Sequence, residues 1–209
     1  MFKFLYPAIV MFMINVLYVS AVEGQQTSLS HAECYDNSIQ VSCPFPRDYF
    51  PGIDFSGRAP DDYSFTRLAH GGVELEDDAL HADYGGPWIM TRDNSTGLVW
   101  EVKTADNKYD KYSYDQAVFW AERIDLGGYS DWRIPSAGEL FSLVDKSRHA
   151  PAIDEKWFPN TLPENYWSSS ADPFDYGGIW RIRFGSGIVL FTYNRSAAYY
   201  VRAVRFDDR

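Results

Sequence analysis

The stretch GGYSDWRIPSAGEL, residues 127–140, constrains the fold more than any other part of the chain. Gly127 follows a helical pattern, and glycine at such a place favours the left-handed backbone that ends a helix. Ser136 is followed three residues later by Glu139, which is the capping box that starts a helix, and Pro135 blocks an earlier start. The stretch therefore predicts a corner between two helices.

Three residues fill this corner between the two helix signals. We expect Trp132 to be buried, because a large indole in a short connection is best placed against the core. Asp131 is expected to accept local N–H bonds, and Arg133 to pair with a carboxylate. A corner of this kind supports the fold and is a poor place for chemistry.

The segment before the corner predicts the first helix, from Ser113 to Gly127. Ser113 and Gln116 form a second capping box. The apolar residues that follow have the i, i+3, i+4, i+7 spacing of one buried helix face; they are Tyr114, Ala117, Val118, Ala121 and Ile124. After the corner, Leu140, Leu143 and Val144 give the second helix its apolar stripe.

The other patterns predict strands. We expect two strands around a turn at 93–97, a strand at 166–169, a hairpin around 185–187 and a last strand at 199–206. Apolar and charged residues alternate from 180 to 184, although the turn length leaves open whether Leu190 or Phe191 shares the face of the arginines. The order predicts an α+β fold, an antiparallel sheet with two helices.

The N-terminus predicts export. Residues 1–21 have the layout of a signal peptide, with an apolar run after Lys3; a retained membrane anchor is the alternative. We expect residues 22–86 to be an irregular segment and 87–209 to be the domain. The only two cysteines, Cys34 and Cys43, are predicted to form a disulfide, with free thiols as the alternative. The protein is thus expected to be secreted, periplasmic or on the cell surface, without stable membrane insertion after cleavage.

The charges are unevenly distributed. The net charge of −10 argues against a nucleic-acid partner. Residues 61–86 carry seven acids and one base, and we expect the acidic patch at 74–83 to be a solvated loop. Residues 176–209 carry six arginines and no lysine, which suits bidentate recognition of carboxylate, sulfate or phosphate.

The second half of the chain resembles a known family. The elements DNSTGLVW (93–100), residues 114–145, YWSSS (166–170) and YYVRAVR (199–205) occur in the order seen in the Lcl C-terminal domain family. The resemblance covers about residues 92–206. The family is named for a bacterial collagen-like adhesin.

The resemblance implies an extracellular or cell-surface bacterial domain. It also implies a relative of the C-type-lectin-like folds, the group that includes formylglycine-generating enzymes, and the adhesin is associated with sulfated polysaccharides and attachment. This chain has no collagen repeat, so it lacks the multivalent stalk. The family often has cysteines where this chain has Trp120 in the first helix and Ala203 in the last strand, which is consistent with the joint loss of one disulfide and suggests that the helix and the strand are neighbours.

One set of residues forms the predicted ligand-binding site, in which arginines grip an anion and aromatic faces stack on a sugar ring. Its members are Tyr176, Arg181, Arg183, Tyr193 and Arg195. The alternative is that these arginines form ion pairs with the acidic patch or with Asp172 and Asp175. Arg202 and Arg205 belong to the family motif and are equally consistent with internal braces.

No catalytic motif stands out. The serines at 168–170 lack the nucleophile elbow, and no phosphate loop is present. His70 and His81 are interpreted as solvated loop residues, with a divalent metal site as the alternative. We expect no catalytic residue, no cofactor and no metal.

The sequence therefore predicts a non-catalytic recognition module, secreted or on the cell surface, that binds glycans or other surface polymers in bacterial adhesion. The alternatives are an uncharacterised enzyme on a lectin-like scaffold and a protein-binding structural subunit of a surface assembly.

Overall fold

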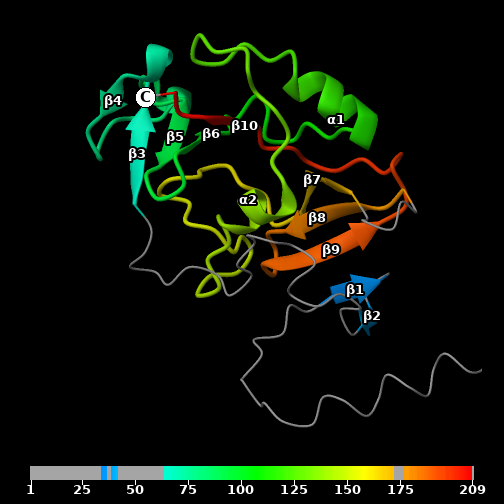
Figure 1. Ribbon diagram of the computed structural model, residues 1–209. Helices are drawn as coiled ribbons and strands as arrows, with labels where there is room; N and C mark the ends of the chain where they lie inside the picture. Colours follow the sequence, from blue (N-terminus) through cyan, green and yellow to red (C-terminus); the bar gives the residue numbers. More distant parts are fainter. Residues whose placement is uncertain (1–33, 37–38, 42–63, 172–176, 209) are drawn as a thin grey trace, which may run out of the picture. The chain divides into compact units, whose positions relative to one another are not determined.

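The structure, a computed structural model, describes residues 64–171 and 177–208 and the strand backbone of residues 34–36 and 39–41 (Figure 1). These two short segments form an antiparallel pair, β1 (Cys34–Asp36) and β2 (Ile39–Val41).

Three sequence predictions fall outside the described residues. They concern the signal peptide at 1–21, the ligand-binding role of Tyr176, and the disulfide, because Cys43 and the side chain of Cys34 are not described. Each of them stays a prediction.

The larger sheet has five antiparallel strands in the order β10-β6-β5-β3-β4. Its strands are β3 (Phe65–Leu68), β4 (Glu74–Leu75), β5 (Met90–Asp93), β6 (Leu98–Glu101) and β10 (Val204–Phe206). The predicted turn at 93–97 joins β5 to β6, and Gly97 there has a φ of +70°. This hairpin is confirmed.

The smaller sheet is a three-stranded antiparallel meander of β7 (Asn165–Ala171), β8 (Ile179–Arg183) and β9 (Ile188–Thr192). Arg181 pairs with Leu190 across the hairpin, so Leu190 shares the face of the arginines and Phe191 lies on the other face. The predicted hairpin and the strand at 166–169 are both confirmed.

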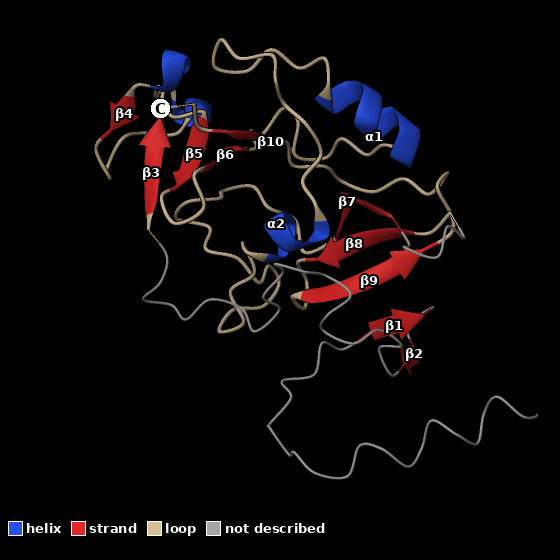
Figure 2. Cartoon of the chain, in the orientation of Figure 1, coloured by secondary structure: helices blue, strands red, loops and turns tan. Residues whose placement is uncertain are grey.

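Two α-helices accompany the sheets in the described part of the chain (Figure 2), α1 (Tyr114–Ala121) and α2 (Ala137–Phe141). Both have the predicted capping box. Two 3₁₀ turns, η3 (His70–Gly72) and η4 (Ala82–Tyr84), lie between β3 and β5. The fold is therefore α+β with antiparallel sheets, as predicted.

Three expectations about element bounds are wrong. The segment before residue 87 was expected to be irregular, but β3 is an inner strand of the larger sheet, paired with both β4 and β5. Helix α1 ends at Ala121, and Gly127 lies instead in a later turn that is closed by backbone hydrogen bonds between Leu126 and Tyr129. The last strand covers only Val204–Phe206 of the expected 199–206.

The last strand is short because its chain crosses from one sheet to the other. Tyr200 pairs with Tyr166 of β7, whereas Val204 pairs with Trp100 of β6. A single segment therefore cannot form a ladder with one sheet along its whole length.

Strand β6 has core residues packed against both of its faces. Trp100 packs with α2 and with residues of the smaller sheet such as Ile182 and Phe184. Val99, on the opposite face, packs with Trp132 and Ala203. Both faces of this strand are thus buried, which explains its nearly uninterrupted apolar sequence.

The corner between the helices is built largely as predicted. Trp132 is buried, with 2% of its surface exposed, and its Nε1 donates to the carbonyl of Leu126 at 3.2 Å. Arg133 donates to both carboxylate oxygens of Glu139, at 2.8 and 2.6 Å. Asp131 accepts a local backbone N–H bond, as expected, and its carboxylate also accepts from Nε of Arg205 at 2.7 Å, which was not expected.

Gly127 is required at this corner for two reasons. Its φ of +70° lies in the left-handed region. A Cβ at this position would also lie 2.5 Å from Cε of Met90 in the core. Any larger residue would therefore be strained and would displace a buried side chain.

Replacing Trp132 with Ala tests the corner. The change empties a buried site and removes the hydrogen bond to Leu126, so we expect it to lower the free energy of unfolding by about 3–5 kcal/mol. Urea unfolding followed by circular dichroism measures this. A loss below about 1 kcal/mol would contradict a packed indole at the corner.

The pair of Asp131 and Arg205 predicts a pH dependence. The hydrogen bond from Arg205 lowers the pKa of the Asp131 carboxyl, and partial burial opposes it. The stabilisation is therefore present above the unfolded pKa of about 3.9 and is lost as the pH falls through the lower folded pKa. We expect wild type to be more stable than Asp131→Asn at neutral pH and the difference to shrink in acid. Urea unfolding between about pH 7 and pH 2 measures it; a difference that does not change with pH would refute the assignment.

Candidate functional site

The four described residues predicted to bind ligand are distributed over two places. Arg181 and Arg183 share a face of β8, as the alternation predicts. Tyr193 and Arg195 follow β9 at the other end of the hairpin, because β9 runs antiparallel to β8. The structure does not bring Arg183 together with Tyr193, so the described members of the set do not form one site.

The two arginines of β8 differ in what they contact. The Nη1 of Arg181 donates to the hydroxyl of Tyr199, and its guanidinium carbon lies 4.6 Å from the centre of that ring. Burial lowers the pKa of Arg181, and Tyr199 opposes this. Arg183 is exposed and forms no ion pair within the described part of the chain. Of these two arginines, only Arg183 is thus exposed and without an ion-pair partner among the described residues.

Arg195 is engaged with the start of α1. Its Nη2 lies 2.7 Å from Oδ1 of Asp115, and its guanidinium carbon lies 4.4 Å from the centre of the Tyr114 ring. Tyr193 is 60% exposed and meets Phe191 edge to face, with ring centres 4.6 Å apart. Within the described residues, neither Arg181 nor Arg195 pairs with the acidic patch at 74–83; a pairing with Asp172 or Asp175 lies outside the description.

The arginines of the terminal motif are internal braces. Arg202 is fully buried and donates to the carbonyl oxygen of Glu101 at 2.6 Å and to Oγ1 of Thr161 at 2.7 Å. Arg205 is also buried, and it binds Asp131 and Asp208. Their positions leave them no role on an exposed binding surface.

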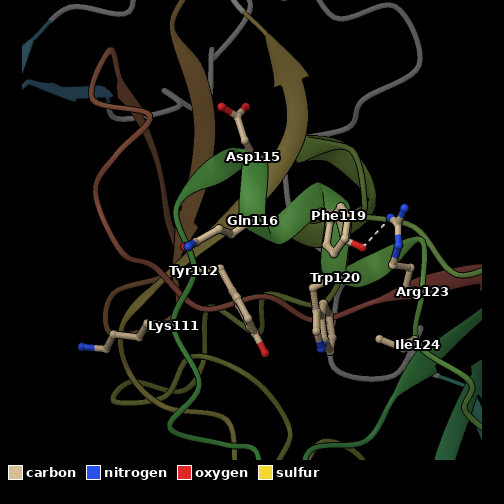
Figure 3. Close-up of a pocket in the computed structure, with 8 residues that line it drawn as sticks. All are labelled: Lys111, Tyr112, Asp115, Gln116, Phe119, Trp120, Arg123 and Ile124. Atoms are coloured by element: carbon tan, nitrogen blue, oxygen red, sulfur yellow. Dashed lines mark hydrogen bonds between the residues drawn. The ribbon is translucent and has the colours of Figure 1, made fainter.

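An open groove beside α1 is the better-formed site (Figure 3). Its volume of about 860 Å³ falls within the roughly 300–1,000 Å³ typical of ligand sites. It is lined by Lys111, Tyr112, Asp115, Gln116, Phe119, Trp120, Arg123 and Ile124. None of these residues belongs to the set predicted from the sequence, although Asp115 is the partner of Arg195.

Aromatic rings form the wall of this groove. Tyr112 and Trp120 stack with ring centres 5.4 Å apart and an angle of 24° between their planes. Figure 3 shows the two rings on the same side of α1, whereas Asp115 points away from them. Phe119 stands beside them with 58% of its surface exposed.

The position of Tyr112 is set by neighbouring backbone. Its N–H and carbonyl both pair with Tyr199, and its carbonyl also accepts from Nε1 of Trp167 at 2.8 Å. The next residue, Ser113, caps α1 and exchanges hydrogen bonds with Gln116. The groove therefore begins at a fixed strand-to-helix junction rather than on a loose loop.

Both cations of the groove lie over aromatic rings. The guanidinium carbon of Arg123 is 3.5 Å from the centre of the Phe119 ring, and Nη1 of Arg123 donates to the Phe119 carbonyl at 3.3 Å. The Nζ of Lys111 is 4.9 Å from the centre of the Tyr200 ring. Such contacts hold a long side chain in place while its charge stays hydrated.

A buried ion pair between Lys103 and Glu101 lies behind Trp120, on the side that faces the interior of the protein. Nζ of Lys103 lies 2.8 Å from Oε1 of Glu101 and 4.8 Å from the centre of the Trp120 ring. The other oxygen of Glu101 accepts from the backbone N–H of Ala203 at 3.0 Å. Burial lowers the pKa of Lys103, and the attraction of Glu101 opposes it. Trp120 is thus fixed on its inner side by a charged group.

This arrangement also accounts for two positions singled out in the sequence. Trp120 packs against the cluster that contains Ala203. Trp120 of α1 and Ala203, which precedes the last strand, therefore belong to the same part of the core.

Sequence reasoning missed the groove because it considered only the buried face of α1. Phe119 and Arg123 are four residues apart, which places them together on the outer face of a helical segment. A large aromatic residue on the face opposite the apolar stripe was the available signal. The stacking of Tyr112 on Trp120 needed the tertiary structure.

The residues considered for chemistry serve structural roles. Ser168 is buried and donates to the carbonyl of Trp180 at 2.6 Å. His81 was interpreted as solvated, but it is buried, caps η4 and meets the Trp88 ring edge to face. Four acids of the 74–83 patch, Glu74, Glu76, Asp77 and Asp78, are exposed, as expected, whereas the Asp83 side chain is 20% exposed and accepts from the Ala105 N–H and from Asn160. Within the described ranges, no group of three or more His, Cys, Asp or Glu is placed to hold a metal ion.

The fold and the groove define an antiparallel α+β domain with an aromatic site beside its first helix. A sequence model of the Lcl C-terminal domain matches residues 89–205, which is more than half of the chain, and the protein belongs to this family. Comparison with curated proteins gives no match. Among the described residues, no helix is both long and apolar enough to cross a bilayer.

Proposed function

We propose that this protein is a non-catalytic recognition module, secreted or on the cell surface, that binds glycans through the groove beside α1. The observation that carries the proposal is the aromatic wall of Tyr112, Phe119 and Trp120, which is flanked by hydrogen-bonding groups. One face of a pyranose ring is lined by C–H groups and stacks on aromatic rings, while its hydroxyls bind polar side chains.

Membership in the Lcl C-terminal domain family supports the extracellular setting and the role in bacterial adhesion. The antiparallel sheets with two helices are consistent with a relative of the C-type-lectin-like folds. An open groove also suits a polymer, because a chain of sugars can run through it without a free end having to enter a closed pocket.

Replacing Phe119 with Ala tests the groove. Phe119 is exposed, so the change removes contact area for a ligand without emptying the core. We expect binding on a glycan array, and about a tenfold rise in the Kd of the bound glycan in Phe119→Ala, because an aromatic anchor carries much of the free energy of binding. The Kd is measured by isothermal titration calorimetry.

Two variants serve as controls for this experiment. Tyr84→Ala removes an aromatic side chain that is 76% exposed and does not line the groove, and it should bind as wild type does. Arg183→Ala tests the site predicted from the sequence. If Arg183→Ala abolishes binding and Phe119→Ala does not, the groove is not the binding site. If no glycan on the array binds, the recognition function itself is wrong.

A further inference from the structure

We propose that the groove beside α1 accepts an uncharged pyranose polymer and discriminates against polyanions. The inference rests on the proposed glycan-binding function and specifies its ligand. The proposed ligand differs from the sulfated polysaccharides with which the collagen-like adhesin is associated.

The first observation is the balance of charge around the groove. Three charged side chains line it, Lys111, Arg123 and Asp115, and three more interact with lining residues: the cation Arg195 with Asp115, and the carboxylates Glu122 with Arg123 and Asp110 with Tyr112. Equal numbers of the two signs leave no net field to attract a polyanion. The whole chain has a net charge of −10, which adds a general repulsion.

The second observation is that both arginines at the groove, Arg123 and Arg195, already lie beside a carboxylate. Arg195 is held by Asp115 at 2.7 Å, and a sulfate or carboxylate could take this guanidinium only by displacing that carboxylate. Arg123 lies over Phe119 and within 3.9 Å of Glu122. An incoming anion would therefore meet a carboxylate beside each of these two arginines.

The third observation is the neutral chemistry of the groove itself. Tyr112, Phe119 and Trp120 offer ring edges and those ring faces that are not covered by each other, by Arg123 or by Lys103. The Gln116 amide accepts from the Ser113 N–H through Oε1, which leaves its NH₂ group as a neutral donor. Burial raises the pKa of Tyr112, so its phenol stays neutral at ordinary pH. These groups match the C–H faces and hydroxyls of uncharged sugars.

The arginine face of β8 provides the internal contrast. Arg183 is exposed there, with no ion pair in the described part of the chain, and Arg181 lies two residues away. A sulfated polymer that bound this protein through salt-sensitive contacts would be expected on that face rather than in the groove. The two surfaces can therefore be tested separately.

The experiment compares neutral polysaccharides with sulfated polysaccharides that have the same sugar backbone. Dextran is paired with dextran sulfate and hydroxyethyl cellulose with cellulose sulfate, alongside galactomannan and chitohexaose as further neutral probes. The Kd of each is measured for the full mature chain in about 50 and 500 mM NaCl, concentrations that change the screening length severalfold. Wild type is compared with Phe119→Ala, Arg183→Ala, Asp115→Asn/Glu122→Gln, and Glu155→Gln as a control for an exposed acid away from the groove.

We expect at least one neutral probe to bind more than tenfold more tightly than its sulfated partner, with a Kd that changes less than about twofold between the two salt concentrations. Phe119→Ala should weaken this binding, and Arg183→Ala and Glu155→Gln should not. Removing the two carboxylates in Asp115→Asn/Glu122→Gln should raise the affinity for the sulfated probe.

Two results would overturn the inference in different ways. If sulfated probes bind more tightly than neutral ones and Phe119→Ala abolishes that binding, the groove binds glycans but prefers polyanions. If sulfated probes bind only through Arg183, or no probe binds at all, both the inference and the proposed role of the groove are wrong.

Discussion

The rest of the described structure depends on the hydrogen bonds made by the buried side chain of Arg202. Arg202 lies where the chain crosses from the smaller sheet, at Tyr200, to the larger sheet, at Val204. Its guanidinium donates to the carbonyl of Glu101 and to Thr161, which fixes the crossing to both β6 and the loop before β7. A fully buried cation is costly unless it is hydrogen-bonded, so this crossing is held in one position.

The same crossing positions the groove. Glu101 binds the N–H of Ala203 with one carboxylate oxygen and Lys103 with the other, and Lys103 lies against Trp120. Tyr112, the partner of Trp120, is paired with Tyr199 just before the crossing. Because both rings are tied to the same segment, the aromatic wall is arranged before any ligand arrives, and little ordering free energy has to be spent on binding.

The local parts of this fold could be predicted from the sequence. Both capping boxes, the 93–97 turn, the buried Trp132 and the pairing of Arg133 depend on residues close in the chain, and all are confirmed. The misses depend on distant partners. β3 was taken for irregular chain because its four residues carry little pattern without β5 beside them, and the carboxylate of Asp131 is bound by Arg205, 74 residues away.

The site was harder to predict for the same reason. The alternation of arginines along β8 was correctly interpreted as one face, but Arg181 is engaged by Tyr199 and Arg195 by Asp115, which the sequence does not reveal. The groove is formed by a helix face and by a tyrosine held against Tyr199. Residue types alone indicated an arginine site, whereas their tertiary partners favour an aromatic one.

The most direct measurement is a titration of ¹⁵N-labelled protein with the neutral polysaccharide that binds most tightly, followed by amide chemical shifts. A groove beside α1 predicts that the largest shift changes fall in residues 111–124, with little change along β8 and β9. Shift changes concentrated in residues 179–195, with residues 111–124 unaffected, would contradict the assignment of the groove. They would indicate that the polysaccharide binds at the arginine face of β8 instead.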